Sequence, residues 1–348
     1  MALTSLLEAV KKLDAVSQRK IAVIVGAAVG DAAARPLHWV YDNTALQSYI
    51  KDTWDSPEFF PKSMSPFYSL PTGETSNYWD LAESSLDALS DLDNSPYNYQ
   101  SICDALVKNF GPGNPNYDIA AKKEYLEKRR RGAIDGPLIG KWISSSLIEF
   151  FDNYKSGQGS KPFGGPNIKE TDGFCANLPF ICKYHDTEAF DEITLEVIKT
   201  LTTWPLAETH GVVASKIVAH LIKSGSDYNI LDIKSEIAAD HPDVHRNIND
   251  VEDVIQEEMD HTSAVKLFGS ACSSPGSFQG ALHAVLTSKS YSEGVRKTIR
   301  AGGCNCSRAV FAGAMSGAMY GIEGVPLDWM EKTTGIERIL TKALKVYS

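Results

Sequence analysis

The amino-acid sequence predicts an all-α protein, and three observations support this fold class. Segments whose apolar residues recur with the 3.6-residue period of a helix follow one another along most of the chain. Alternating β-branched and aromatic residues between Asn-Gly or Asp-Gly turns, the pattern of β-hairpins, are nearly absent. Hydrophobic residues make up 43% of the chain and charged residues 22%, which is typical of a globular protein and excludes a disordered one.

The helical period predicts the individual elements in order along the chain. Helices are expected at Lys20–Ala34, Tyr78–Asp91, Pro137–Phe151, Glu188–Leu201, Gly211–Ile222, Val244–Thr262 and Ser292–Arg300. Pro137 suits the first turn of its helix, because a first-turn residue needs no backbone N–H. The stretch Ala309–Gly321 is apolar on nearly all sides, which predicts a buried central helix with Asn305 or Ser307 as its N-cap.

Two stretches have no clear period. Asp42–Thr75 is rich in proline and aromatic residues, and Tyr154–Asn167 is rich in Gly, Ser and Pro. Each is either a domain boundary or a loop over a pocket, and helices of similar composition flank both. Because long loops in compact proteins are often functional, we favour loops and a single compact multi-helix domain over residues 1–348.

Charge and cysteine content limit the functional classes. With 34 basic and 44 acidic side chains the net charge is −10, which argues against a nucleic-acid partner. The basic run around Lys122 and Arg129–Arg131 is interpreted as a solvated helix face. The apolar run Ile21–Gly30 is shorter than the roughly 18 residues of a membrane span, so we expect a soluble, cytoplasmic protein without membrane contact. Six cysteines without a Cys-x-x-Cys motif predict neither a disulfide scaffold nor a zinc ribbon.

The segment Gly26–Asp42 is the first that could carry chemistry. Gly26 and Gly30 lie four residues apart, a spacing that lets a second helix approach closely. Asp31 follows an apolar turn, where a carboxylate is costly unless it is paired. It is either satisfied by a neighbouring amide inside tight packing, or it lies with His38 and Trp39 at the mouth of a pocket. The spacing alone leaves both interpretations open.

The segment Ala301–Arg308 is the second. Gly302 and Gly303 precede the predicted central helix, whose N-terminus is suited to bind an anion or to hold ligands. Accessible thiols at Cys304 and Cys306 would have lowered pKa values there, whereas the simpler interpretation is two small residues packed at a helix start. Farther along the chain, Asp172 and Asn177 either place polar groups in a pocket or form the polar stripe of a helix.

Five motifs together resemble the ADP-ribosylglycohydrolase family, most closely its crystallin J1 and selenoprotein J branch, from about Ile21 to about Thr333. The resemblance implies an all-α domain of the ADP-ribosylglycohydrolase type with a central cleft. It also implies that active members bind two Mg²⁺ ions between a Thr-Asp-Asp element and a Gly-Gly-Asp-Thr-Asp-Thr element, and release ADP-ribose from a modified side chain. The motifs are Gly30–Asp42, Ser270–Gly280, Ala301–Arg308, Gly317–Gly321 and Val325–Trp329.

The chain departs from the family pattern at both metal elements. The second element reads Cys304-Asn305-Cys306-Ser307, and the first is best matched by Thr75-Ser76-Asn77-Tyr78, so four carboxylates are missing. Asp80 is the nearby acid that could replace a lost ligand, and His38 stands near the position where some members carry an acidic residue. Because Mg²⁺ requires hard oxygen ligands, we expect the magnesium site to be lost and no cofactor to be bound.

Three functions follow as hypotheses. The first is a non-hydrolytic structural protein of the eye-lens crystallin type, in effect a pseudoenzyme. The second is an ADP-ribosyl or related glycosidic hydrolase with altered chemistry, in which Cys304 or Cys306 is the nucleophile and His38 the base, or in which these three residues hold one Zn²⁺ ion. The third is a module that binds ADP-ribose or a related nucleotide, and homo-oligomers remain open in each case. Catalytic candidates are His38, Asp80, Cys304 and Cys306; ligand-binding candidates are Gly30, Asp31, His38, Trp39, Ser76, Asn77, Tyr78, Asp172, Asn177, Gly303, Asn305, Ser307 and Arg308.

Overall fold

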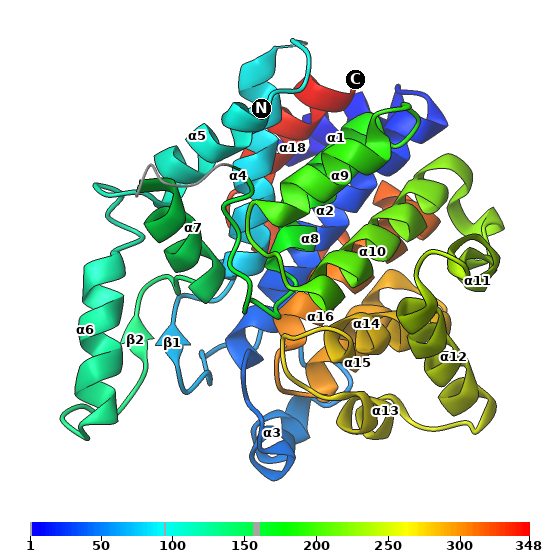
Figure 1. The fold of residues 1–348 in the computed structure, drawn as a ribbon. Coiled ribbons are helices and arrows are strands. Elements are labelled where there is room, and N and C mark those ends of the chain that lie inside the picture. The colour runs from blue at the N-terminus through cyan, green and yellow to red at the C-terminus, as the bar shows by residue number, and fades with distance from the viewer. Residues whose placement is uncertain (1, 94, 156–160) are drawn as a thin grey trace.

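The fold is helical throughout, in agreement with the predicted all-α class (Figure 1). The structure is a computed structural model that describes residues 2–93, 95–155 and 161–348. Its α helices are α1 (Leu3–Lys11), α2 (Ala15–Ala34), α3 (Asn43–Ile50), α4 (Asn77–Leu92), α5 (Tyr99–Phe110), α6 (Ile119–Arg130), α7 (Ser145–Lys155), α8 (Asp172–Tyr184), α9 (Phe190–Lys199), α10 (Pro205–Ser224), α11 (Ile233–Ile237), α12 (Pro242–Gln256), α13 (His261–Phe268), α14 (Gly276–Leu286), α15 (Tyr291–Arg300), α16 (Asn305–Tyr320), α17 (Leu327–Lys332) and α18 (Ile336–Tyr347). Short 3₁₀ turns are η1 (Arg35–Leu37), η2 (Lys51–Thr53), η3 (Gly225–Asp227), η4 (Ile230–Asp232) and η5 (Ile322–Gly324), and β1 (Tyr68–Ser69) pairs in parallel with β2 (Leu138–Ile139).

Helices α2 and α16 form the centre of the molecule. Every residue from Ile21 to Ala34 and from Asn305 to Ala318 is buried, as expected for helices that are apolar on all sides. Around this pair, α14 and α15 pack on α16, α18 packs on α2, and α4 packs on α8 (Figure 1). The predicted central helix at Ala309–Gly321 is therefore confirmed.

Glycines allow the two central helices to cross in close contact. A Cβ atom on Gly26 would lie 2.3 Å from the carbonyl oxygen of Gly313, and one on Gly317 would lie 2.1 Å from the carbonyl oxygen of Ala22. The pairing of Ala22 with Gly317 and of Gly26 with Gly313 makes the helices antiparallel. The four-residue glycine spacing thus has the packing role that the sequence predicted.

Two predicted helices differ from the observed ones. Pro137–Phe151 does not begin as a helix, because Leu138 donates to the Phe67 carbonyl in the β1–β2 pairing and Gly140 has a φ of +118°; α7 begins only at Ser145. Val244–Thr262 is two helices. Helix α12 ends at Gln256, Glu258 takes a left-handed φ of +54°, and the Asp260 side chain caps α13 by accepting from the Ser263 backbone N–H.

The two aperiodic stretches also contain structure. Within Asp42–Thr75, Asp42 accepts from the backbone N–H groups of Thr44 and Ala45 and so begins α3, and β1 follows later. Of Tyr154–Asn167, the first residues end α7 and residues 156–160 lie outside the described part of the chain. Among the described residues, no helix combines the length and apolar character needed to cross a membrane.

Candidate functional site

Asp31, near the C-terminal end of α2, is fully buried and bound by Ser76. Its two carboxylate oxygens accept from the Ser76 backbone N–H at 2.6 Å and from the Ser76 hydroxyl at 2.7 Å. Burial raises the pKa of the Asp31 carboxyl to about 7, although the Ser76 hydrogen bonds favour the ionised form. Asp31 thus links the end of α2 to the start of α4. This agrees with the interpretation in which a neighbouring amide satisfies the carboxylate inside tight packing.

A short backbone pairing brings His38 next to Cys304. The Trp39 N–H donates to the Gly303 carbonyl and the Gly303 N–H donates to the Val40 carbonyl, each at 2.8 Å. Trp39 and Gly303 both have left-handed φ values, +63° and +61°. Glycine is required at 303, because a Cβ atom there would lie 2.4 Å from the Ser270 carbonyl oxygen.

His38, Cys304 and Tyr78 form a buried hydrogen-bonded cluster. The Cys304 Sγ lies 3.3 Å from His38 Nε2 and 3.2 Å from the Tyr78 hydroxyl, and His38 Nδ1 lies 2.8 Å from the Tyr68 hydroxyl. The His38 ring stacks on Trp39 with centroids 4.2 Å apart. The three residues of this cluster come from three separate segments, the residues after α2, the start of α4 and the cap position of α16.

Opposing effects act on the ionisation of this cluster. Burial by itself raises the pKa of the Cys304 thiol, but hydrogen bonds from Cys272 and His38 outweigh it and hold the pKa well below its ordinary value. Burial lowers the pKa of His38. The neighbouring thiol of Cys272 behaves in the opposite way, because its hydrogen bond to Cys304 and then burial raise its pKa. Cys304 is therefore the more acidic of these two thiols.

The other residues at the start of α16 hold the backbone. Asn305 donates to the Ala34 carbonyl at 3.1 Å and Ser307 donates to the Cys304 carbonyl at 2.9 Å. Neither is the N-cap that the sequence predicted; Cys304 occupies that position without a side-chain cap bond. The buried Arg308 guanidinium donates to the carbonyls of Ser270 and Gly302 and so holds the preceding turn.

Cys306 does not join Cys304 and His38. Its thiol lies 3.9 Å from the Asp31 carbonyl oxygen, and burial raises its pKa well above the ordinary value. The zinc alternative with His38, Cys304 and Cys306 is therefore wrong; nowhere in the described ranges do three metal-ligating side chains come together. Neither thiol is accessible to solvent.

A pocket of about 200 Å³ opens beside the cluster, and we call it the aromatic pocket. Trp39, Asn77, Tyr78 and Asp172 are predicted ligand-binding residues that line it. Burial and the neighbouring Glu170 raise the pKa of Asp172 to about 8. The described residues that line it are Trp39, Tyr41, Phe67, Asn77, Tyr78, Trp142, Ser144, Ser145, Glu170, Asp172 and Cys272.

Three predicted site residues lie elsewhere. Asp80 forms a 2.9 Å ion pair with Lys141 and lines a separate hollow of about 240 Å³. Asn177 donates to the hydroxyls of Thr194 and Ser215 inside the core. Gly30 packs against α16, where a Cβ atom would lie 2.7 Å from the Ala309 carbonyl oxygen.

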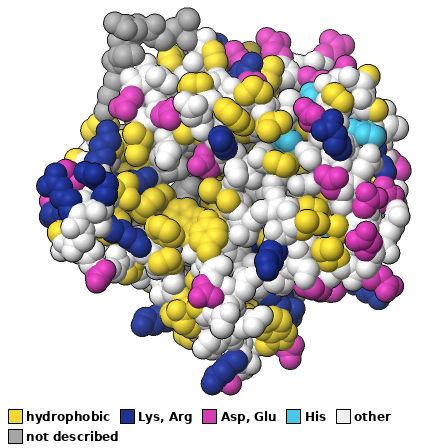
Figure 2. Space-filling model, turned by 60° about the horizontal axis from the view of Figure 1, so that its bottom comes forward, with side chains coloured by type: hydrophobic (Ala, Val, Ile, Leu, Met, Phe, Trp, Pro, Cys, Tyr) yellow, Lys and Arg dark blue, Asp and Glu magenta, His cyan; other side chains and the backbone are white. Residues whose placement is uncertain are grey.

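Sequence reasoning missed several residues at the aromatic pocket. Trp142 and Glu170 belong to no motif, and Cys272 lies in the Ser270–Gly280 motif, which could have indicated it. Lys122 was expected on a solvated face, yet it is buried with its Nζ 4.3 Å from the Trp142 ring centroid. Figure 2 shows hydrophobic side chains gathered near the middle of this face of the molecule, with Lys and Arg side chains at its left edge.

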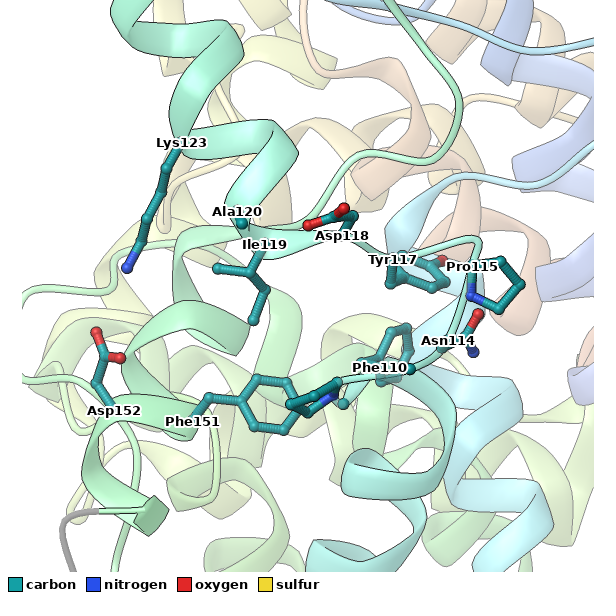
Figure 3. A pocket seen from close by; sticks show the side chains of 13 residues that line it. Phe110, Asn114, Pro115, Tyr117, Asp118, Ile119, Ala120, Lys123, Phe151 and Asp152 are labelled. Carbon is teal, nitrogen blue, oxygen red and sulfur yellow. The ribbon is translucent and has the colours of Figure 1, made fainter.

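A hollow of about 570 Å³ lies between α5, α6 and α7, and its walls are mainly apolar. Figure 3 shows Ile119 and Phe151 pointing into the same space, with Lys123 and Asp152 at one side. None of the predicted site residues lines it, and its Asp118 carboxylate accepts from the Ala121 N–H as the cap of α6. The convergent polar groups lie at the aromatic pocket instead.

Comparisons with known proteins cover almost the whole chain. A family model described as ADP-ribosylglycohydrolase matches residues 13–347. Crystallin J1A of Tripedalia cystophora is 29% identical over 321 residues, which cover 92% of this chain and 94% of that protein. Crystallin J1B of the same animal is 26% identical over 331 residues, 95% of this chain and 97% of that protein. A solved ADP-ribosylglycohydrolase-related protein complex has the same fold, with a TM-score of 0.67 at 17% identity over 96% of this chain and 99% of that one.

Proposed function

Because the chain belongs to the ADP-ribosylglycohydrolase family, as its motifs predicted, we propose that it keeps the family's fold without two-magnesium hydrolysis and has a structural role of the crystallin type. The observation that carries this proposal is the buried His38–Cys304–Tyr78 cluster. Its Cys304 sulfur stands where the resemblance implies a carboxylate ligand of the second element, and Ser76 and Asn77, beside Tyr78, stand where it implies the two carboxylates of the first.

The donor set does not fit paired magnesium ions. Mg²⁺ takes hard oxygen ligands in near-octahedral geometry, whereas thiols are soft ligands. Asp31 is a buried carboxylate of this region, and both of its oxygens already accept hydrogen bonds from Ser76. Asn77 offers a neutral amide and Cys304 a soft sulfur, so these positions do not supply the hard carboxylate oxygens that two magnesium ions need. We therefore derive no step through magnesium.

A ligand screen tests the loss of magnesium chemistry. We expect neither MgCl₂ nor ADP-ribose, alone or together, to change the melting temperature. A ligand that does bind would stabilise the native state by about 2.7 kcal/mol at 100 times its Kd, so binding would be seen as a higher melting temperature. Release of ADP-ribose from an ADP-ribosylated protein is expected to equal the rate without enzyme. An active hydrolase of the same family serves as the positive control. Release that depends on magnesium and stops with EDTA would contradict the proposal.

The structural role rests on different support. Two relatives that match most of the chain are named crystallins. The net charge of −10 favours repulsion between molecules and thus high solubility, as a concentrated structural protein needs. Static light scattering at rising protein concentration measures this directly, and a negative second virial coefficient in low salt would count against the role.

A second candidate function is thiol chemistry at Cys304, and one geometric observation favours it. His38 Nε2 lies 3.3 Å from the sulfur while Tyr68 fixes the other ring nitrogen, which is the arrangement of a nucleophile, a base and an orienting group. However, Cys304 is fully buried, and Tyr78 and Cys272 lie between it and the aromatic pocket.

Alkylation separates the two candidates. In the native protein at pH 7 we expect iodoacetamide to modify Cys304 more slowly than free cysteine, because the reagent has no path to the sulfur. Peptide mapping by mass spectrometry gives the rate for each thiol, and a C304S variant identifies the peptide. Rapid modification of Cys304 would favour the thiol enzyme over the structural role.

A further inference from the structure

The aromatic pocket combines electron-rich rings with oxygen acceptors on one wall. We propose that it binds a small organic cation with N–H donors, of the alkylammonium class. The inference does not depend on the structural role proposed above, since it concerns a ligand and not catalysis.

Three rings of the pocket are set edge to face. Trp39 lies 5.2 Å from Trp142 and 5.4 Å from Phe67 between centroids, with interplanar angles of 78° and 83°. Phe67 and Trp142 are 6.2 Å apart at 74°. Rings in this arrangement present several faces to one volume, and the face of an aromatic ring attracts a cation within about 6 Å.

Two cationic side chains of the protein already make cation–π contacts with these rings. The Lys122 ammonium lies 4.3 Å from the centroid of Trp142, and the Arg129 guanidinium lies 4.9 Å from that of Phe67. Both side chains come from the peripheral helix α6 (Figure 1), and neither lines the pocket. We infer that ring surface toward the pocket remains free for a further cation.

The polar wall offers acceptors. Asn77 is 2% exposed, and its Oδ1 has no hydrogen-bond partner, while its Nδ2 is turned to the Asp172 carboxyl at 3.4 Å. Glu170, half-buried, adds a carboxylate to the same wall. An unpartnered buried acceptor is costly, so a ligand that donates N–H groups here relieves that cost.

Charge and size argue for a small cation in this pocket over the nucleotide ligand of the third hypothesis. None of the described residues that line the pocket is basic, and the nearby Lys122 already interacts with Glu170 and Asp172, so a pyrophosphate would meet the Glu170 carboxylate with no cation in the pocket wall itself. The volume of about 200 Å³ is below the range of about 300–1,000 Å³ that drug-sized ligands occupy. The ligand is therefore small, and it is a cation.

Calorimetric titration of the full chain at pH 7 with n-butylammonium chloride tests the proposal. We expect saturable one-to-one binding of n-butylammonium and none of n-butanol, sodium butyrate or ADP-ribose. Glu170→Gln and Trp142→Leu are each expected to weaken binding at least tenfold. Glu188→Gln, an exposed site away from the pocket, is the matched control and should leave the affinity unchanged. Unchanged melting temperatures show that the variants are folded.

Several outcomes would overturn the proposal. One is butylammonium binding no more tightly than butanol, and another is equal affinity in Glu170→Gln, Trp142→Leu and the parent protein. Binding of ADP-ribose or butyrate in place of the amine would reverse the charge assignment. Tetramethylammonium, which has no N–H donor, is expected to bind more weakly than butylammonium; equal affinity would overturn the part assigned to Asn77 and Glu170.

Discussion

Alanine at position 317 is expected to destabilise the protein by about 2–3 kcal/mol, because its Cβ atom cannot fit between α2 and α16. That atom would lie 2.1 Å from the Ala22 carbonyl oxygen and 3.3 Å from the Val23 nitrogen. These are backbone atoms of a buried helix, so they cannot turn away as a flexible side chain could. The two central helices would have to move apart along their whole crossing.

A second glycine-to-alanine change provides the control. Gly294 is buried within α15, and the nearest atom to a Cβ there is the Ser316 hydroxyl oxygen at 3.6 Å, an ordinary contact. Alanine favours the helix by up to about 1 kcal/mol over glycine, so G294A should be neutral or stabilising. Urea denaturation of both variants measures the difference. Equal stabilities for G317A and G294A would show that the close crossing is absent.

The sequence predicted the central helices well because local pattern determines them. A run that is apolar on all sides with glycines four apart leaves few arrangements other than a close buried crossing, and the structure has it. The failure at Pro137–Phe151 has the opposite cause. Leu138 pairs with Phe67, about seventy residues earlier, and a contact so distant in sequence leaves no periodicity to read.

The candidate site was predictable only in part for the same reason. Family motifs pointed to His38, Tyr78 and Cys304, which the structure brings within hydrogen-bond distance. Trp142 and Glu170 lie outside every motif and gain their role when the chain folds around the aromatic pocket. Asp80 was the opposite case: it contacts the first element through the Thr75 hydroxyl, but it also pairs with Lys141 and lines a separate hollow, not the aromatic pocket.

Acid is expected to destabilise the protein between about pH 6.5 and pH 4 through a buried histidine pair. His261 Nδ1 lies 3.0 Å from His283 Nδ1, and neither Nε2 atom has a partner. Burial and the nearby Lys297 lower the pKa of His283 to about 4, and burial together with His283 lowers that of His261 well below 6.5. Asp260 acts on His283 in the opposite direction, and the Arg308 charge adds to the effect on His261.

The sign follows from proton uptake. Below pH 6.5 the unfolded chain binds protons at these histidines while the native state stays neutral, so stability is fully present above pH 6.5 and falls as the pH decreases towards 4. For His283 alone the loss reaches about 3 kcal/mol, since each pKa unit corresponds to about 1.4 kcal/mol.

Urea midpoints from pH 7.5 to 4.5 measure this loss of stability. Other buried histidines, such as His210, contribute equally in every variant. H283F should therefore flatten the loss of stability at low pH. The control H245Q changes a half-buried histidine outside the pair and should leave that loss unchanged. An equal decline in H283F and the parent protein would mean that the pair does not titrate on unfolding.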